Sequence, residues 1–303
     1  MDCHPKSGVR RLIGSAVLVL TAIAATGCAH ALSQPMPDLK GRLALKVSSE
    51  RPSKMSEMPV GVHQIPDTSV YVSGHQGAAG VGVLFGIIGG AVASAAAKAT
   101  GARKTKDFEA QLRLDIPKIT ERALAEELGR RVDVGRFATA DASGDGSLEI
   151  MPYLVVTFIG NDQVRPWVVL RTKLKDLGGR TKWAQQYIAG VGEVRQLGGE
   201  EGWASNDGAP LRAAVDRNLR LAIDVVLRDA SGALPRATAR SVKVEGNWVW
   251  AKEPKEAVTQ VLDETEEILV VYYKPSAFAG QSIFAEGVNI LDKKAVTVTA
   301  EPK

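Results

Sequence analysis

The chain has 303 residues, of which 45% are hydrophobic and 24% charged, and its formal net charge at pH 7 is +4. This length suffices for a sizeable core in one or two domains, and the charge is too small and too scattered to indicate nucleic-acid binding. No His or Cys follows His75, which excludes Ser-His-Asp triads, Cys-His pairs and His- or Cys-ligated zinc from the rest of the chain. We therefore expect no catalytic residue, no cofactor and no metal, and the protein is not predicted to be an enzyme.

The first 28 residues have the order of a secretory signal. A basic segment with Lys6, Arg10 and Arg11 precedes an uncharged run from Leu12 to Gly27. The run is shorter than the about 20 apolar residues that a membrane-spanning helix needs. It ends in the sequence ATGC, in which small residues directly before a cysteine resemble a bacterial lipobox. We expect cleavage before Cys28 and acylation of its thiol, and an ordinary signal with an incidental cysteine is the alternative.

Composition divides the chain into four parts. Residues 1–27 are the predicted lipoprotein signal peptide, whose removal lowers the net charge from +4 to +2. Residues 28–40, interrupted by two prolines, are predicted to be a tether. Residues 41–235 are expected to form an α+β domain, and residues 236–303, with several short runs of strand character, a small β domain.

A glycine-rich helix is predicted within the α+β domain, over residues 76–100. Small residues recur there at every fourth position, as Gly82, Gly86, Gly90 and Ser94. This spacing puts them on one helix face, where another backbone can approach closely. Glycine costs about 1 kcal/mol per helical residue relative to alanine, so the helix needs a packing partner. Three partners remain open: the protein's own domain, a membrane or its interface, and a second copy of the helix.

The remaining pattern predicts the fold class. Helical periodicity covers residues 107–128, with a start or kink near Asp115, and residues 207–228, where Asn206 or Asp207 could cap the helix. Runs of strand character separated by Gly-, Asn- and Asp-rich turns predict an antiparallel meander with one solvated side, over residues 132–138, 148–159, 164–174 and 181–189. The predicted class is α+β: an antiparallel sheet with two principal packed helices, plus the glycine-rich helix and a small all-β C-terminal appendage.

One segment resembles a calcium-binding loop. Asp141, Ser143, Asp145 and Gly146 match the first, third, fifth and sixth positions of an EF-hand. The twelfth position, which should carry a bidentate Glu, is Pro152. No helix clearly precedes the segment, and a predicted strand follows it. We therefore interpret it as a hairpin turn without a metal.

The combination of features resembles known envelope lipoproteins. Over residues 40–235 the order of elements is similar to the periplasmic domain of the curli-secretion lipoprotein and of penicillin-binding-protein activator lipoproteins. The likeness rests on the lipobox, the 107–128 helix, Trp183 and Tyr187 in the meander, and the segment GEEGWASNDG at 199–208. Together with the glycine-rich run, it resembles uncharacterised bacterial outer-membrane lipoproteins. By this resemblance, Ala29 after the cysteine implies the outer membrane.

These observations predict a lipid-anchored, non-catalytic cell-envelope protein that faces the periplasm and binds a protein or another envelope component. Its membrane contact would be the lipid on Cys28, and we expect no nucleic-acid partner. One alternative is an oligomeric export or secretion accessory component that assembles through the glycine-rich helix. Another is a carboxylate-dependent envelope hydrolase, because Asp and Glu are plentiful, although no spacing singles out a catalytic pair.

Overall fold

The computed structural model describes residues 36–37, 41–52, 57–76, 86–131, 136–138, 146–236, 239–275 and 284–300, without the side chains of residues 86–91. Several sequence predictions therefore lie wholly or partly outside the described residues. They include the signal peptide and tether with the acylation of Cys28, the position of Gly82, the start of the 132–138 strand and the calcium-like segment that begins at Asp141.

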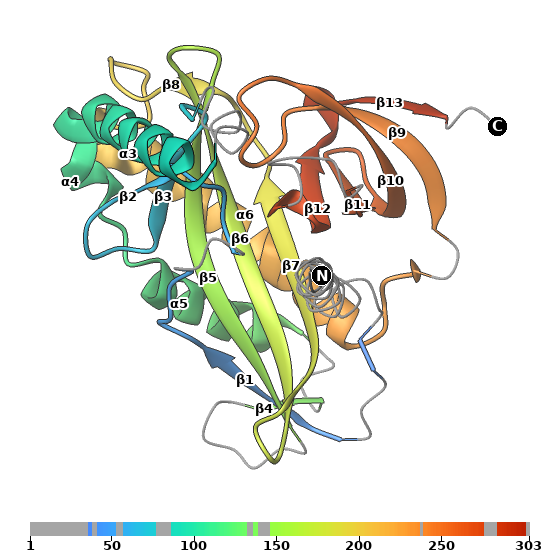
Figure 1. The fold of residues 1–303 in the computed structure, drawn as a ribbon. Coiled ribbons are helices and arrows are strands. Elements are labelled where there is room, and N and C mark those ends of the chain that lie inside the picture. The colour runs from blue at the N-terminus through green and yellow to red at the C-terminus, as the bar shows by residue number, and fades with distance from the viewer. Residues whose placement is uncertain are drawn as a thin grey trace, which may run out of the picture.

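A mixed sheet of 13 strands dominates the described residues (Figure 1). The strands are β1 (Leu43–Val47), β2 (His63–Gln64), β3 (Val70–Ser73), β4 (Phe137–Ala138), β5 (Gly146–Ile159), β6 (Gln163–Asp176), β7 (Thr181–Gly190), β8 (Arg195–Gln196), β9 (Arg240–Gly246), β10 (Lys255–Glu264), β11 (Ile268–Tyr273), β12 (Gly287–Asp292) and β13 (Thr297–Ala300). The α-helices are α3 (Gly86–Thr105), α4 (Glu109–Leu112), α5 (Ile116–Arg130) and α6 (Ser205–Ala230).

The predicted α+β fold class is wrong, because the described chain is mostly β and its sheet is mixed rather than antiparallel. Strands β1 and β3 pair in parallel with β5, and β12 pairs in parallel with β7. Through β12, the C-terminal strands β9 to β13 continue the same sheet instead of forming an appendage. The alternation of apolar residues reveals that a strand exists but not which distant strand it pairs with, so these pairings were missed.

The centre of the sheet is the antiparallel meander of β5, β6 and β7. The register between β5 and β6 runs without a break from Gly146↔Asp176 to Ile159↔Gln163. Residues 150–158 of β5 are all buried, so both faces of this strand are covered. The predicted solvated side is therefore absent from the middle of the meander, and it begins only beyond Arg171 towards the β6–β7 turn.

Two hydrophobic clusters cover the two faces. On one face, α5 and α6 pack against the meander through side chains such as Leu124, Leu219 and Ile223. On the other, alternate residues such as Tyr153 and Trp167 contact a cluster built from β9, β10, β11 and the segment that contains Trp248, Val249 and Trp250. Within the described residues, no helix combines the length and the apolar character that crossing a membrane would take.

Candidate functional site

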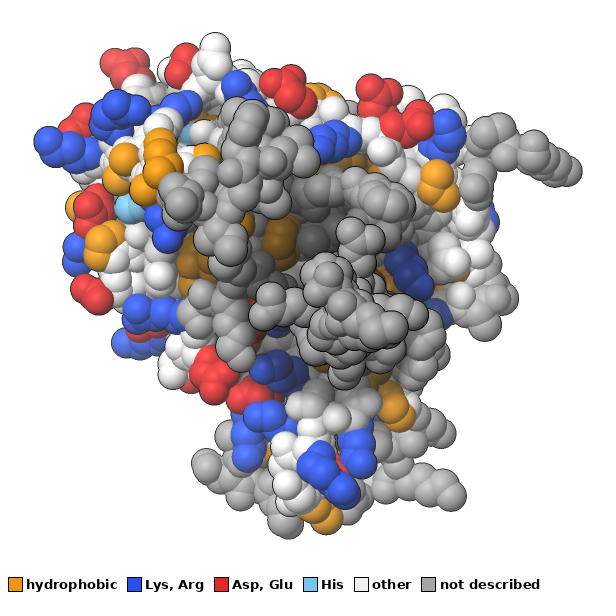
Figure 2. Space-filling view, in the orientation of Figure 1, with side chains coloured by type: hydrophobic (Ala, Val, Ile, Leu, Met, Phe, Trp, Pro, Cys, Tyr) orange, Lys and Arg blue, Asp and Glu red, His pale blue; other side chains and the backbone are white. Residues whose placement is uncertain are grey.

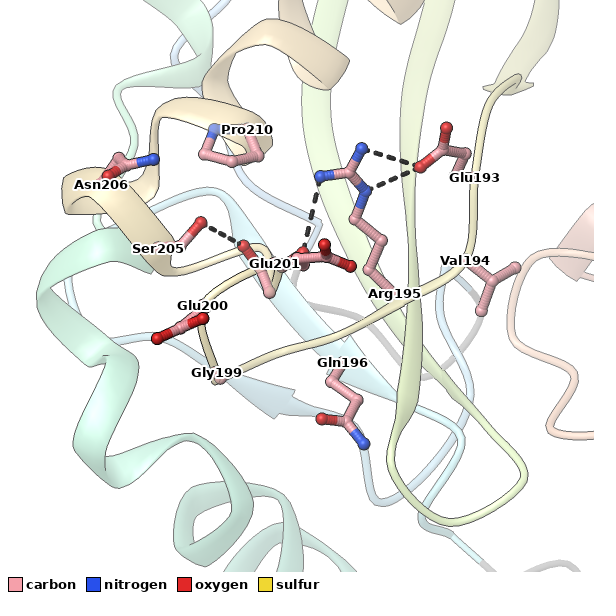
Figure 3. A pocket seen from close by; sticks show the side chains of 12 residues that line it. Glu193, Val194, Arg195, Gln196, Gly199, Glu200, Glu201, Ser205, Asn206 and Pro210 are labelled. Carbon is pink, nitrogen blue, oxygen red and sulfur yellow. Dashed lines mark hydrogen bonds and ion pairs between the residues drawn. The ribbon is translucent and has the colours of Figure 1, made fainter.

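A polar pocket of about 660 Å³ lies where β8 and the loop after it meet the start of α6 (Figure 3). Most of the lining residues are polar or are glycines. They are Glu193, Val194, Arg195, Gln196, Gly198, Gly199, Glu200, Glu201, Gly202, Ser205, Asn206 and Pro210. The pocket overlaps the segment GEEGWASNDG at 199–208, one of the features on which the resemblance to envelope lipoproteins rests.

Two contacts hold the pocket loop on the sheet. Strand β8 pairs with the start of β6, where Arg195 lies opposite Val164. The buried Trp203 indole Nε1 donates a hydrogen bond of 2.8 Å to the Val164 carbonyl. Between them the loop folds back on itself so tightly that a Cβ on Gly202 would lie 2.2 Å from the Gly198 carbonyl oxygen. Glycine is thus required at residue 202 by the close approach of the backbone.

The backbone at the pocket's edge is left-handed over three consecutive residues. Asn206, Asp207 and Gly208 have φ values of 48°, 56° and 77°, and the regular part of α6 begins after them. Neither Asn206 nor Asp207 takes the predicted N-cap position, because both lie inside the range of α6, whose N-cap is Ala204. Left-handed conformations of residues other than glycine cost about 1–3 kcal/mol each and concentrate at functional sites. The strained backbone therefore makes this edge of the pocket a candidate functional site.

Some of the charged side chains around the pocket form ion pairs and others do not. The Glu193 carboxylate accepts from Arg195, whose Nε lies at 2.9 Å and Nη2 at 2.7 Å, and the guanidinium lies 5.4 Å from the Trp203 ring centre. Figure 3 shows this pair on one side of the pocket. The carboxylates of Glu200 and Glu201 are exposed and, as far as the described residues show, make no ion pair. The pocket therefore carries an excess of negative charge.

The lining offers hydrogen-bonding groups and charge for a ligand. The Ser205 hydroxyl donates to the Gly202 carbonyl at 2.8 Å, and no lining residue is a His, Cys or Lys that could activate it as a nucleophile. The described residues also contain no group of three or more His, Cys, Asp and Glu side chains arranged to hold a metal ion. The pocket therefore presents hydrogen-bonding groups and three carboxylates, of which Glu193 is paired with Arg195.

The small residues of α3 make a second close contact. A Cβ on Gly101 would lie 2.6 Å from the His63 Cβ and 2.7 Å from the His75 ring. One on Gly61 would lie 2.8 Å from the Ala97 Cβ and 3.8 Å from the Ser94 Cα. The C-terminal half of α3 thus packs on the segment around β2 and β3, within the protein's own fold. Gly86 and Gly90 lie earlier in α3, where the surroundings of side chains are not described.

The contact under α3 includes two histidines that the sequence did not single out. His75 Nε2 lies 3.3 Å from the Gly61 carbonyl oxygen. Burial lowers the pKa of both His63 and His75. Glu109 raises and Lys98 lowers the pKa of His63. Polar contacts with the Gly61 and Ser73 backbone raise the pKa of His75, while the charges of His63 and Lys104 lower it.

Comparisons with known proteins add little to this geometry. No family model matches the chain, and no curated protein matches it. A solved structure with some likeness is the crystal structure of a Xanthomonas campestris protein of the family DUF330, with a TM-score of 0.25 and 15% identity over 40% of this chain. The match spans 61% of the length of that protein. A likeness this weak supports no conclusion about fold or function.

The histidine contact predicts that stability falls in acid. Because burial favours the neutral rings in the fold, the unfolded chain binds more protons once the pH drops below the ordinary value of 6.5. Stability is therefore complete above that pH and declines below it. Melting temperatures measured from neutral pH to about pH 5 should fall less for the double variant His63→Gln, His75→Gln than for the wild type. Identical pH profiles of the two proteins would contradict the role assigned to these rings.

Proposed function

We propose that the protein is a lipid-anchored, non-catalytic component of the bacterial cell envelope, attached to the outer membrane and facing the periplasm. Its partner would be a peptide segment of another protein, bound in the pocket between β8 and α6. The observation that carries this proposal is the pocket itself. It combines polar lining, a strained edge at Asn206 and Asp207, and no paired nucleophile and base.

The lining of the pocket favours a peptide over a small organic molecule. Small-molecule sites are lined mainly by hydrophobic and aromatic side chains. Here Val194 and Pro210 are the apolar lining residues besides the glycines. Gly199 is exposed, and a main-chain hydrogen bond to it would be a common means of binding an extended peptide, whereas the amide and carbonyl of Gly202 are already bonded within the loop. The unpaired carboxylates of Glu200 and Glu201 favour a peptide with Lys or Arg side chains.

The lipid anchor is supported by the sequence around Cys28. Small residues lead directly to this cysteine, behind a basic segment and an uncharged run. A single acyl chain gives only marginal membrane binding, so stable attachment requires the several chains that a bacterial lipoprotein carries. The anchor would keep the pocket close to partners in the same membrane.

Acylation of Cys28 is tested by the variant Cys28→Ala. Metabolic labelling with a fatty-acid analogue should mark the wild type and leave the variant unmarked, because alanine has no thiol to acylate. The variant should also leave the membrane fraction or stay unprocessed. Equal labelling of the two proteins would show that Cys28 is not the acylated residue.

Peptide binding is tested by photo-crosslinking in intact cells. The crosslinking residue p-benzoylphenylalanine replaces Glu200 at the pocket or, as the control, the exposed Val258 of β10. We expect a discrete crosslinked protein from the pocket site only. The substitution Glu201→Lys in the same chain should remove most of that product, because it reverses a charge that attracts the peptide. The same products from both sites, or none from the pocket, would contradict a peptide-binding role.

A further inference from the structure

The turn between β6 and β7 lies at the end of the sheet where the chain enters it. Leu43, the first residue of β1, pairs with Gly146, and Gly146 pairs with Asp176, the last residue of β6. Leu43 follows Cys28 by 15 residues. A chain of that length spans at most about 50 Å. The path from the proposed lipid anchor into the fold therefore arrives at the same end of the molecule as this turn.

The turn displays an apolar side chain. Leu177 is 80% exposed, whereas most large hydrophobic side chains of the described residues are buried. The turn that carries it is closed by hydrogen bonds of 2.9 Å from the Gly179 amide to the Asp176 carbonyl and from the Arg180 amide to the Asp176 carboxylate. A closed turn presents Leu177 in one place rather than letting it fold back onto the sheet.

Basic residues occur in the turn and along the adjoining ends of β1, β6 and β7. They are Arg42, Lys46, Lys173, Lys175, Arg180 and Lys182, and with Leu177 we call them the turn patch. Glu149 pairs with Lys175 at 2.6 Å, and Asp176 pairs with Arg180 and Lys182 at 3.1 and 3.2 Å. Asp141 and Asp145 precede β5 in the sequence, and the patch remains net positive when they are counted too. Figure 2 shows Lys and Arg side chains gathered at the lower end of the molecule, where Figure 1 places this turn.

We propose that the turn patch is the membrane-facing surface of the protein and rests on an anionic lipid bilayer, with Leu177 entering the boundary between headgroups and acyl chains. This inference rests on the proposed lipid anchor, which holds the patch beside the membrane. An exposed apolar residue on a surface that carries many basic side chains suits that boundary, because the basic side chains attract anionic headgroups while the apolar side chain leaves water. The contact would set the orientation of the protein on the membrane.

The test uses the lipidated full-length protein in vesicles that contain phosphatidylglycerol. Leu177→Cys supplies a free thiol for an environment-sensitive fluorophore, since Cys3 lies in the predicted signal and Cys28 would be acylated. Val258→Cys, on β10, is the matched control at another exposed apolar position. We expect lipids with nitroxide labels near the headgroup to quench most of the emission at residue 177 and little of it at residue 258.

Charge variants test whether the basic side chains of the turn patch attract the membrane. Arg180→Glu with Lys182→Glu should remove most of the quenching at residue 177, as should high salt or vesicles of phosphatidylcholine alone. Lys255→Glu, a charge reversal on exposed β10, should leave it unchanged. Protein that floats with the vesicles while residue 177 stays unquenched overturns the contact and leaves the anchor intact. Equal quenching at both sites also overturns the contact, and protein that does not float overturns both anchor and contact.

Discussion

Asn218 of α6 bonds both backbone groups of Val191, the residue that follows the end of β7. Its Oδ1 accepts a hydrogen bond of 2.8 Å from the Val191 amide, and its Nδ2 donates to the Val191 carbonyl at 3.1 Å and to the Ala214 carbonyl at 2.9 Å. The side chain is buried, so water does not replace these bonds. Each backbone group left buried without a partner would cost about 1–3 kcal/mol. The middle of α6 is thereby held at one position on the sheet.

Buried polar contacts at both ends of α6 complete this attachment. Before the helix, Trp203 donates to the Val164 carbonyl. Near its end, the Tyr187 hydroxyl donates to the Asp229 carboxylate at 2.6 Å, and Arg236 donates to the same carboxylate. Burial beside Asp229 raises the pKa of Tyr187, which keeps the hydroxyl protonated as a donor. Because the helix is held along its whole length, the left-handed turn and the pocket before it have a defined place relative to β6 and β8.

The sequence predicted individual helices and strands better than it predicted which of them pair or pack together. Helical periodicity and a start near Asp115 correspond to α5, where the Asp115 carboxylate accepts from the Lys118 amide. The left-handed turn at 206–208 is not distinguishable from a helix cap in the sequence, because Asn and Asp are common both as N-caps and in left-handed backbone. The parallel pairing of β12 with β7 joins residues about a hundred positions apart, and the contact of Gly101 with His63 and His75 depends on tertiary packing. Neither leaves a periodic signal in the sequence.

The substitution Asn218→Leu tests the attachment of α6 most directly. Leucine has the same number and branching of side-chain heavy atoms as asparagine but leaves the Val191 amide and carbonyl without partners, so we expect a loss of about 2–5 kcal/mol in the free energy of unfolding measured by denaturant titration. Arg217→Leu, at the adjacent half-exposed position, is the control and should change stability by no more than about 0.5 kcal/mol. A loss at Asn218 as small as that of the control would contradict the central role of this residue.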